Sequence, residues 1–107
     1  MSNVVDVTDA NFAEVVLQSP KPVLVDYWAD WCAPCKQLSP IVEELAAQHG
    51  DKVTFVKMDT NANTAVPAAQ GIMSLPTLQV FVGGEVVTQL VGAKSKAALT
   101  KALAEYL

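Results

Sequence analysis

The chain contains two cysteines, and they lie three residues apart in the stretch Trp-Cys-Ala-Pro-Cys-Lys at positions 31–36. An apolar run at 23–28 precedes this stretch. Apolar residues at helical spacing follow it, namely Leu38, Ile41, Val42 and Leu45. The pattern places the pair where a strand ends and a helix begins. Free N–H groups and the helix dipole favour negative charge there, so the reactive thiolate form of a cysteine is stabilised.

The spacing of the pair indicates what it can do. Side chains at i and i+3 lie on one helical face, close enough to form a disulfide. Closing so short a loop constrains the unfolded chain by only about 2 kcal/mol, against roughly 5 kcal/mol for a hundred-residue loop. A redox role is therefore favoured over a purely structural bridge. Zinc binding is the weaker alternative, because structural zinc takes four ligands and the chain has one histidine, His49.

Composition narrows the class of protein. The length of 107 residues and a hydrophobic content of 51% predict a single domain, 1–107, with one well-filled core. Seven lysines, no arginine and a net charge of −4 argue against nucleic-acid binding. We expect no membrane partner, because no apolar stretch approaches the length of a membrane span. The first residues lack the pattern of a signal peptide, which predicts a cytoplasmic protein.

Hydrophobic periodicity predicts the elements in order. Positions 4–7 form a short strand, and Thr8 or Asp9 caps a first helix that buries Phe12, Val15 and Val16. A buried strand at 23–28 contains one carboxylate, Asp26. The cysteine helix then runs to Gly50.

The second half continues the alternation. A strand at 53–59 precedes a short helix within 60–71 that we expect Pro67 to break. Strands at 78–82 and 85–91 flank the turn pair Gly83-Gly84, and Ser95 caps the last helix. The order β-α-β-α-β-α-β-β-α predicts an α/β fold with a mixed sheet and helices on both faces.

These motifs together resemble the thioredoxin family. The likeness rests on residues 25–36 around the cysteines, on Gly-Ile-Met-Ser-Leu-Pro-Thr-Leu at 71–78, on Gly-Gly-Glu at 83–85 and on Val-Gly-Ala at 91–93. It covers essentially the whole chain and implies the thioredoxin fold, a five-stranded mixed sheet with four helices on both faces. Ala33 departs from the family, in which most members carry glycine, and Met73 is arginine in some members.

The resemblance implies a role for each cysteine. Cys32 corresponds to the attacking thiolate, which we expect to be exposed, and Cys35 to a more buried resolving thiol. Cys32 attacks a client disulfide to form a mixed disulfide, and Cys35 then displaces the client and closes the Cys32–Cys35 bridge.

Two charged residues are implied to assist. Asp26 corresponds to a buried carboxylate with a raised pKa that accepts the Cys35 proton. The alternative is a buried acid that simply finds hydrogen bonds. Lys57 corresponds to the partner of that carboxylate; alternatively, it is a strand lysine with its ammonium group in water.

The remaining implied residues form a docking surface. Pro76 is implied to follow a cis peptide bond, so that the Leu75 backbone is presented to an extended client segment. Gly92 is alternatively only a turn residue, Trp28 is expected in the core, and His49 is assigned no role. The full surface comprises Trp31, Ala33, Pro34, Ile72, Leu75, Pro76, Gly92 and Ala93.

The implied function is a protein-disulfide reductase and electron carrier. Its partners are protein disulfide substrates and a thioredoxin reductase that uses NADPH, and the chain itself is a monomer without a bound cofactor or metal. One alternative is an oxidase or isomerase of the same fold, which requires an oxidising compartment. Another is a binding subunit without turnover, which the intact cysteine pair disfavours.

Overall fold

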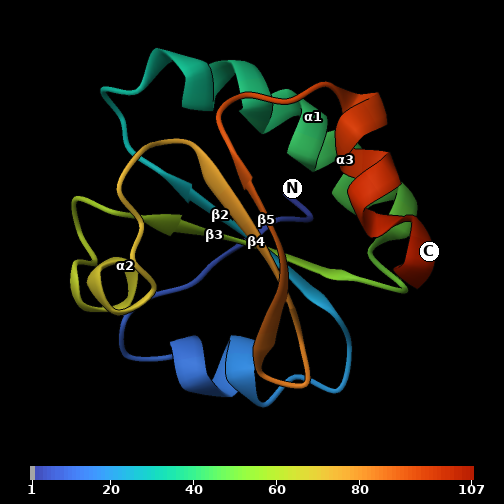
Figure 1. Cartoon of the computed structure of the whole chain (residues 1–107), viewed down its shortest axis with the longest axis horizontal. Helices are drawn as coiled ribbons and strands as arrows, with labels where there is room; N and C mark the ends of the chain where they lie inside the picture. Colours follow the sequence, from blue (N-terminus) through green and yellow to red (C-terminus); the bar gives the residue numbers. More distant parts are fainter. Residues whose placement is uncertain (1) are drawn as a thin grey trace.

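The computed structural model describes residues 2–107, in which one sheet lies between two layers of helices (Figure 1). β1 pairs with β3 and β3 with β2 in parallel, whereas β2–β4 and β4–β5 are antiparallel. The predicted five-stranded mixed sheet is therefore confirmed. The strands lie side by side in the order β1-β3-β2-β4-β5. In chain order they are β1 (Val5–Asp6), β2 (Val23–Trp28), β3 (Thr54–Asp59), β4 (Thr77–Val82) and β5 (Glu85–Val91).

Helices cover both faces of the sheet, as predicted (Figure 1). The long helix α1 and the C-terminal helix α3 pack on one face, and the short helices η1 and α2 lie on the other. No helix within residues 2–107 is long and apolar enough to cross a membrane. The helices are η1 (Ala13–Leu17), α1 (Ala33–His49), α2 (Ala65–Ala69), α3 (Lys96–Leu103) and η2 (Ala104–Tyr106).

The central strand β2 divides its side chains between the two core layers. Leu24 packs with the α1 and α3 residues, whereas Val25 and Tyr27 pack with η1. Successive side chains of a strand point to opposite faces, so Asp26 shares the face of Leu24 and points toward α1. Asp26, the one carboxylate in the apolar run at 23–28, thus lies on the same side of the sheet as the cysteine helix.

Two local predictions were wrong. The first helix has no side-chain cap: Thr8 accepts a hydrogen bond from the Asn11 N–H, and Asp9 instead caps α2, far along the chain. Pro67 does not break α2 but is its third residue. A proline is tolerated there because the first N–H groups of a helix have no partner within the helix.

The hairpin between β4 and β5 is confirmed, with the two-residue turn that the sequence predicts. Gly83 and Gly84 have φ values of 60° and 84°, a left-handed conformation that glycine adopts without steric cost. The same hairpin carries β5 to the edge of the sheet, beyond β4.

Candidate active site

The two cysteines are joined by a disulfide at the start of α1, the predicted strand-to-helix junction. Cys32 is the N-cap residue, with φ −91° and ψ 103°, and its Sγ accepts a hydrogen bond from the Cys35 N–H at 3.2 Å. The Cys32 N–H donates to the Ala29 carbonyl at 3.1 Å. The Cα atoms of the pair lie 5.3 Å apart, within the usual disulfide range. Because Pro34 falls in the first turn, its missing N–H costs the helix no hydrogen bond.

The expected difference in exposure between the two cysteines is wrong. Each has only 4% of its surface exposed, because both pack against Ala29, Trp28 and Leu75. The residues that flank Cys32 on both sides, Trp31 and Ala33, are exposed. Position distinguishes the two sulfurs instead: Cys32 caps the helix, whereas Cys35 lines a cavity behind the disulfide.

That cavity has a volume of about 120 Å³ and lies between β2, β3 and α1. It brings Cys35 together with both charged residues that the sequence singled out, Asp26 and Lys57, which are partners in the parallel register of β2 and β3. Within residues 2–107, no cluster of three or more potential ligands could hold a metal ion. The cavity is lined by Asp26, Trp28, Cys35, Lys36, Ser39 and Lys57.

Asp26 is buried without satisfying its carboxylate. It is 5% exposed, and its Oδ1 has no hydrogen-bond partner within residues 2–107. Burial raises the pKa of Asp26 to about 7, and the positive charge of Lys57 offsets only part of that increase. A carboxyl group with a pKa near neutrality can both accept and release a proton at physiological pH.

Lys57 is half-buried and does not form an ion pair with Asp26, within the described part of the chain. Its Nζ lies 5.9 Å from the centroid of the Trp28 ring, a cation–π distance. Trp28 is itself half-buried, and its Nε1 is a second polar atom that has no partner in residues 2–107. We expected Trp28 to be a core residue, but it is half-buried and lines the cavity.

The loop before β4 approaches the cysteines from another part of the chain. The Leu75–Pro76 peptide bond is cis, as the family resemblance implied. Gly92 donates its N–H to the Pro76 carbonyl at 2.8 Å, so the turn after β5 is tied to this loop. Gly92 has φ +91°, which also gives it the turn role that was the alternative interpretation.

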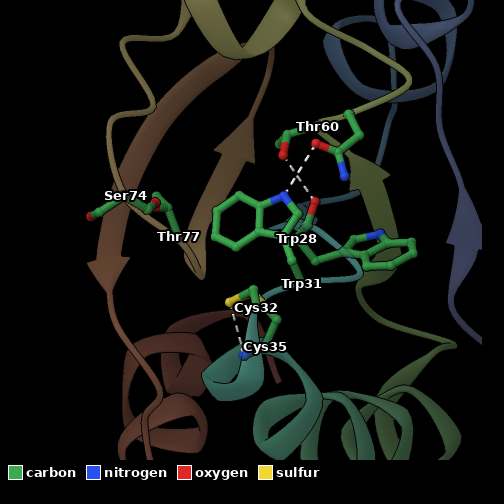
Figure 2. Close-up of a disulfide and its surroundings, with 8 residues drawn as sticks. Trp28, Trp31, Cys32, Cys35, Thr60, Ser74 and Thr77 are labelled. Carbon is green, nitrogen blue, oxygen red and sulfur yellow. Dashed lines mark hydrogen bonds between the residues drawn. A yellow bond between two sulfur atoms is a disulfide. The ribbon is translucent and has the colours of Figure 1, made fainter.

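Figure 2 shows Trp28 and Trp31 beside the disulfide, and Trp31 is one of the large apolar side chains that are exposed. Trp31 is 70% exposed and lies between the cysteines and Thr60, with its Nε1 donating to the Asn61 Oδ1 at 3.3 Å. Met73 is 95% exposed. A second cavity, of about 220 Å³, opens beside Trp31 and is lined by Trp31, Thr60, Pro67, Ile72, Met73, Ser74 and Leu75.

Sequence reasoning missed several residues at these two cavities. Ser39 follows Cys35 by four positions on a helix, so helical spacing alone would have placed it beside the thiol. Lys36 is adjacent to Cys35 in sequence. Thr60 and Asn61 carried no local signal, because their contact with the site depends on how the loop after β3 folds back toward Trp31.

Comparisons with known proteins agree with this geometry. The thioredoxin family model matches residues 3–105. The chain is 51% identical to a thioredoxin of Streptomyces clavuligerus over 96 residues, which cover 90% of this chain and 89% of that protein. It is 45% identical to thioredoxin 1 of a Nostoc species over 107 residues, the full length of both. It is also 45% identical to 22% of a bifunctional thioredoxin reductase/thioredoxin of Mycobacterium leprae, over 94% of this chain.

A cysteine pair that can alternate between dithiol and disulfide, held at a helix start on this mixed sheet, defines a thiol–disulfide oxidoreductase. The match over residues 3–105 makes the class specific: the chain belongs to the thioredoxin family. It is a protein-disulfide reductase that works through Cys32 and Cys35.

Proposed function

We propose that Cys32 is the nucleophile and Cys35 the resolving thiol in the reduction of client disulfides. The Cys32 thiolate attacks one client sulfur, forms a mixed disulfide and releases the other client sulfur as a thiolate. Cys35 loses its proton and attacks the Cys32 sulfur, which releases the second client thiolate and closes the Cys32–Cys35 disulfide. The client gains two electrons and the cysteine pair loses two.

The position of Cys32 at the N-cap supports its assignment. In that position its sulfur accepts the Cys35 N–H, and the helix dipole adds further stabilisation of a thiolate. Cys35 lies inside the first turn of α1, and it lines the cavity that Asp26 also lines. Attack by Cys35 on the mixed disulfide is intramolecular, and well-oriented reactions of this kind reach effective molarities of about 10⁵ M or more.

Asp26 is the proton acceptor for Cys35 in this proposal. The single observation that carries the assignment is the shared cavity: a buried carboxylate without a hydrogen-bond partner in residues 2–107 lines the same cavity as the resolving thiol. A volume of about 120 Å³ has room for water, so the proton can pass directly or through a bridging molecule. Lys57 is the partner that tunes the carboxylate, since its charge lowers the pKa that burial raises.

The client docks on the apolar surface around the disulfide. The proposed docking residues are at least partly exposed except Pro76, which is buried. They are Trp31, Ala33, Pro34, Ile72, Leu75, Pro76, Gly92 and Ala93. Leu75 forms no backbone hydrogen bond with another residue of 2–107, so its peptide groups are free to pair with an extended client segment. This pairing would hold the client sulfur over Cys32.

Electrons return to the pair from a thioredoxin reductase that uses NADPH. The bifunctional thioredoxin reductase/thioredoxin of Mycobacterium leprae supports this partner. Protein thiols are kept reduced in the cytoplasm, and a protein-disulfide reductant acts in such a compartment. We therefore place the protein in the cytoplasm as an electron-transport component. We further propose that it acts as a monomeric single domain, 1–107, without a cofactor of its own.

Trapping experiments test the assignment of the two cysteines. Cys35→Ser should hold clients as stable mixed disulfides on Cys32, whereas Cys32→Ser should hold none. Nonreducing gel electrophoresis after mixing each reduced variant with insulin reports the adducts. Equal trapping by both variants would overturn the assignment.

Turnover and direction need a separate measurement. The unaltered protein should accelerate insulin reduction by dithiothreitol, and the Cys32→Ser/Cys35→Ser double variant should not. The reduction potential of the pair then distinguishes a reductant from an oxidase or isomerase. A value as oxidising as that of the dedicated oxidases, about −120 mV, would contradict the reductase proposal.

A further inference from the structure

The second cavity, beside Trp31, has two walls that come from different parts of the chain. One wall is the segment from Ile72 to Leu75, and the other is Trp31 with Thr60. These two walls lie outside strands and helices, whereas Pro67, which also lines the cavity, belongs to α2. Hydrogen bonds to their surroundings therefore help to fix the relative position of the two walls. Hydrogen bonds connect each wall to Asp9, a residue that does not itself line the cavity.

The first wall is connected through α2. The Asp9 Oδ1 and Oδ2 accept hydrogen bonds from the N–H groups of Val66 and Ala65, at 2.9 and 3.1 Å. These bonds, led by that from Val66, hold the pKa of Asp9 below its usual value. The Pro67 carbonyl then accepts the Ile72 N–H at 2.9 Å. Asp9 thus fixes the N-terminus of a helix whose other bonds place the start of the wall.

The second wall is connected through the loop after β3. The Asp9 N–H donates to the Asn63 Oδ1 at 2.9 Å, and Asn63 donates from its backbone and side chain to the Asp59 carbonyl. The Asp59 Oδ1 accepts the Asn61 N–H at 2.9 Å. The Asn61 Oδ1 accepts the Trp31 Nε1, which completes a continuous set of hydrogen bonds from Asp9 to the indole.

We propose that Asp9 is a positioning residue for client docking. Its carboxylate holds the wall at 72–75 through α2, and its backbone N–H holds the Trp31 wall through Asn63, so removing the carboxylate frees the first wall relative to the second. The inference rests on the proposed function, in which this surface receives the client. Asp9 contacts neither the cysteines nor a client. Its removal should therefore weaken recognition of an extended protein segment without changing the chemistry at Cys32.

Asn11→Ala is a matched control for Asp9→Ala, because it also removes a side-chain acceptor of a backbone N–H in the same segment. Asn11 lies two residues from Asp9, and its Oδ1 accepts the Thr8 N–H at 2.7 Å. That bond stays within the segment before η1 and touches neither α2 nor the loop after β3. Asn11→Ala thus alters the same segment but leaves both connections to the cavity intact.

The experiment compares the unaltered protein with Asp9→Ala, Asp9→Asn and Asn11→Ala. Insulin reduction gives KM and kcat, and the reaction of each reduced protein with a small aromatic disulfide gives the rate of the cysteine chemistry alone. Asp9→Ala should raise the KM for insulin on the order of threefold, with kcat and the small-disulfide rate unchanged. Asp9→Asn, which keeps one acceptor oxygen, should have a smaller effect, and Asn11→Ala none.

Three outcomes would overturn the inference: an unchanged KM in Asp9→Ala, an equal rise in Asn11→Ala, or a parallel loss of the small-disulfide rate. The nitrogen-15 resonance of the Ile72 backbone N–H, which donates to the Pro67 carbonyl of α2, supplies a readout that needs no client. It should shift in Asp9→Ala and not in Asn11→Ala, and an unmoved resonance would contradict the connection. Failure of the unaltered protein to reduce insulin would instead overturn the proposed function, and the Ile72 resonance would still test Asp9.

Discussion

Asp26 and Tyr27 are adjacent on β2, are both buried, and point to opposite faces of the sheet. On the η1 face, the Tyr27 hydroxyl donates to the Gln79 Oε1 at 2.8 Å, and the Gln79 Nε2 donates to the Gln89 Oε1 at 2.9 Å. These two hydrogen bonds connect β2 to β4 and β4 to β5. On the α1 face, the Asp26 Oδ1 and the Trp28 Nε1 have no partner in the described chain.

The difference separates a structural polar group from a functional one. Buried polar atoms are nearly always hydrogen-bonded, because an unpaired group costs roughly 1–3 kcal/mol of stability. The Tyr27 side satisfies this rule with a cross-strand chain of hydrogen bonds. The Asp26 side breaks it at a cavity that is also lined by Cys35, the thiol to which we assign the resolving step. We infer that the cost is retained there because proton transfer needs a carboxyl group with a pKa near 7.

The largest expected difference between the two faces is an increase in the free energy of unfolding when Asp26 is replaced by asparagine. The folded-state pKa of about 7 exceeds the ordinary pKa of an aspartic acid, 3.8, so the folded protein binds the proton more tightly than the unfolded chain does. Its stability therefore falls as the pH rises from about 4 to 7 and stays low above pH 7. Asp26→Asn should raise the free energy of unfolding by at most roughly 4 kcal/mol above pH 7.

Urea denaturation of both proteins between pH 4 and 8 measures that gain. The two unfolding free energies should converge toward the acid end, because below the unfolded pKa the carboxyl group is neutral in both states. A gain of equal size at pH 4 and pH 8 would show that the charge of Asp26 is not its cause.

A smaller loss is expected on the other face. Tyr27→Phe removes the hydroxyl and leaves the Gln79 Oε1 buried without its donor, which should cost about 1–3 kcal/mol at every pH from 4 to 8. The rate of insulin reduction should not change, because Tyr27 faces away from the cysteine cavity. Slowed reduction in a fully folded Tyr27→Phe protein would break the distinction between the two faces.

The smallest expected effect concerns Lys57. Its positive charge lowers the pKa of Asp26, so Lys57→Met should move that pKa upward. The upper end of the pH range over which stability declines should move upward with it, by less than about one pH unit, while the lower end stays at the unfolded pKa. Lys52→Met, on an exposed lysine near the start of β3, is the control that changes net charge equally. An identical shift in both variants would assign the effect to net charge rather than to the cavity.

Local patterns in the sequence were sufficient for the architecture. The turn pair Gly83-Gly84 predicted the hairpin, and the apolar run before Cys32 followed by helical spacing predicted the junction that holds the cysteines. Strand and helix periodicity and turn chemistry act over a few residues, so they can be seen in one sequence. The small differences lie at strand ends: β3 begins at Thr54 and β4 at Thr77, each one residue from its predicted start.

The features that sequence reasoning missed depend on distant contacts. Asp9 looked like a cap for the nearest helix, but its partners Ala65 and Val66 are more than fifty positions away. The burial of Cys32 arises from packing against Trp28 and Leu75, which sequence spacing does not reveal. The unpaired Nε1 of Trp28 is visible only once α1, β2 and β3 are assembled around the cavity.

The rate at which Cys35 resolves a preformed mixed disulfide tests the central claim most directly. The mixed disulfide can be prepared on Cys32 with a small thiol leaving group, and its decay followed by rapid quenching between pH 5 and 9. We predict a rate that rises through an inflection near pH 7, at the pKa of Asp26, and an Asp26→Asn protein in which the rate is lower and that inflection is absent. An unchanged rate and an inflection that persists in Asp26→Asn would contradict the account.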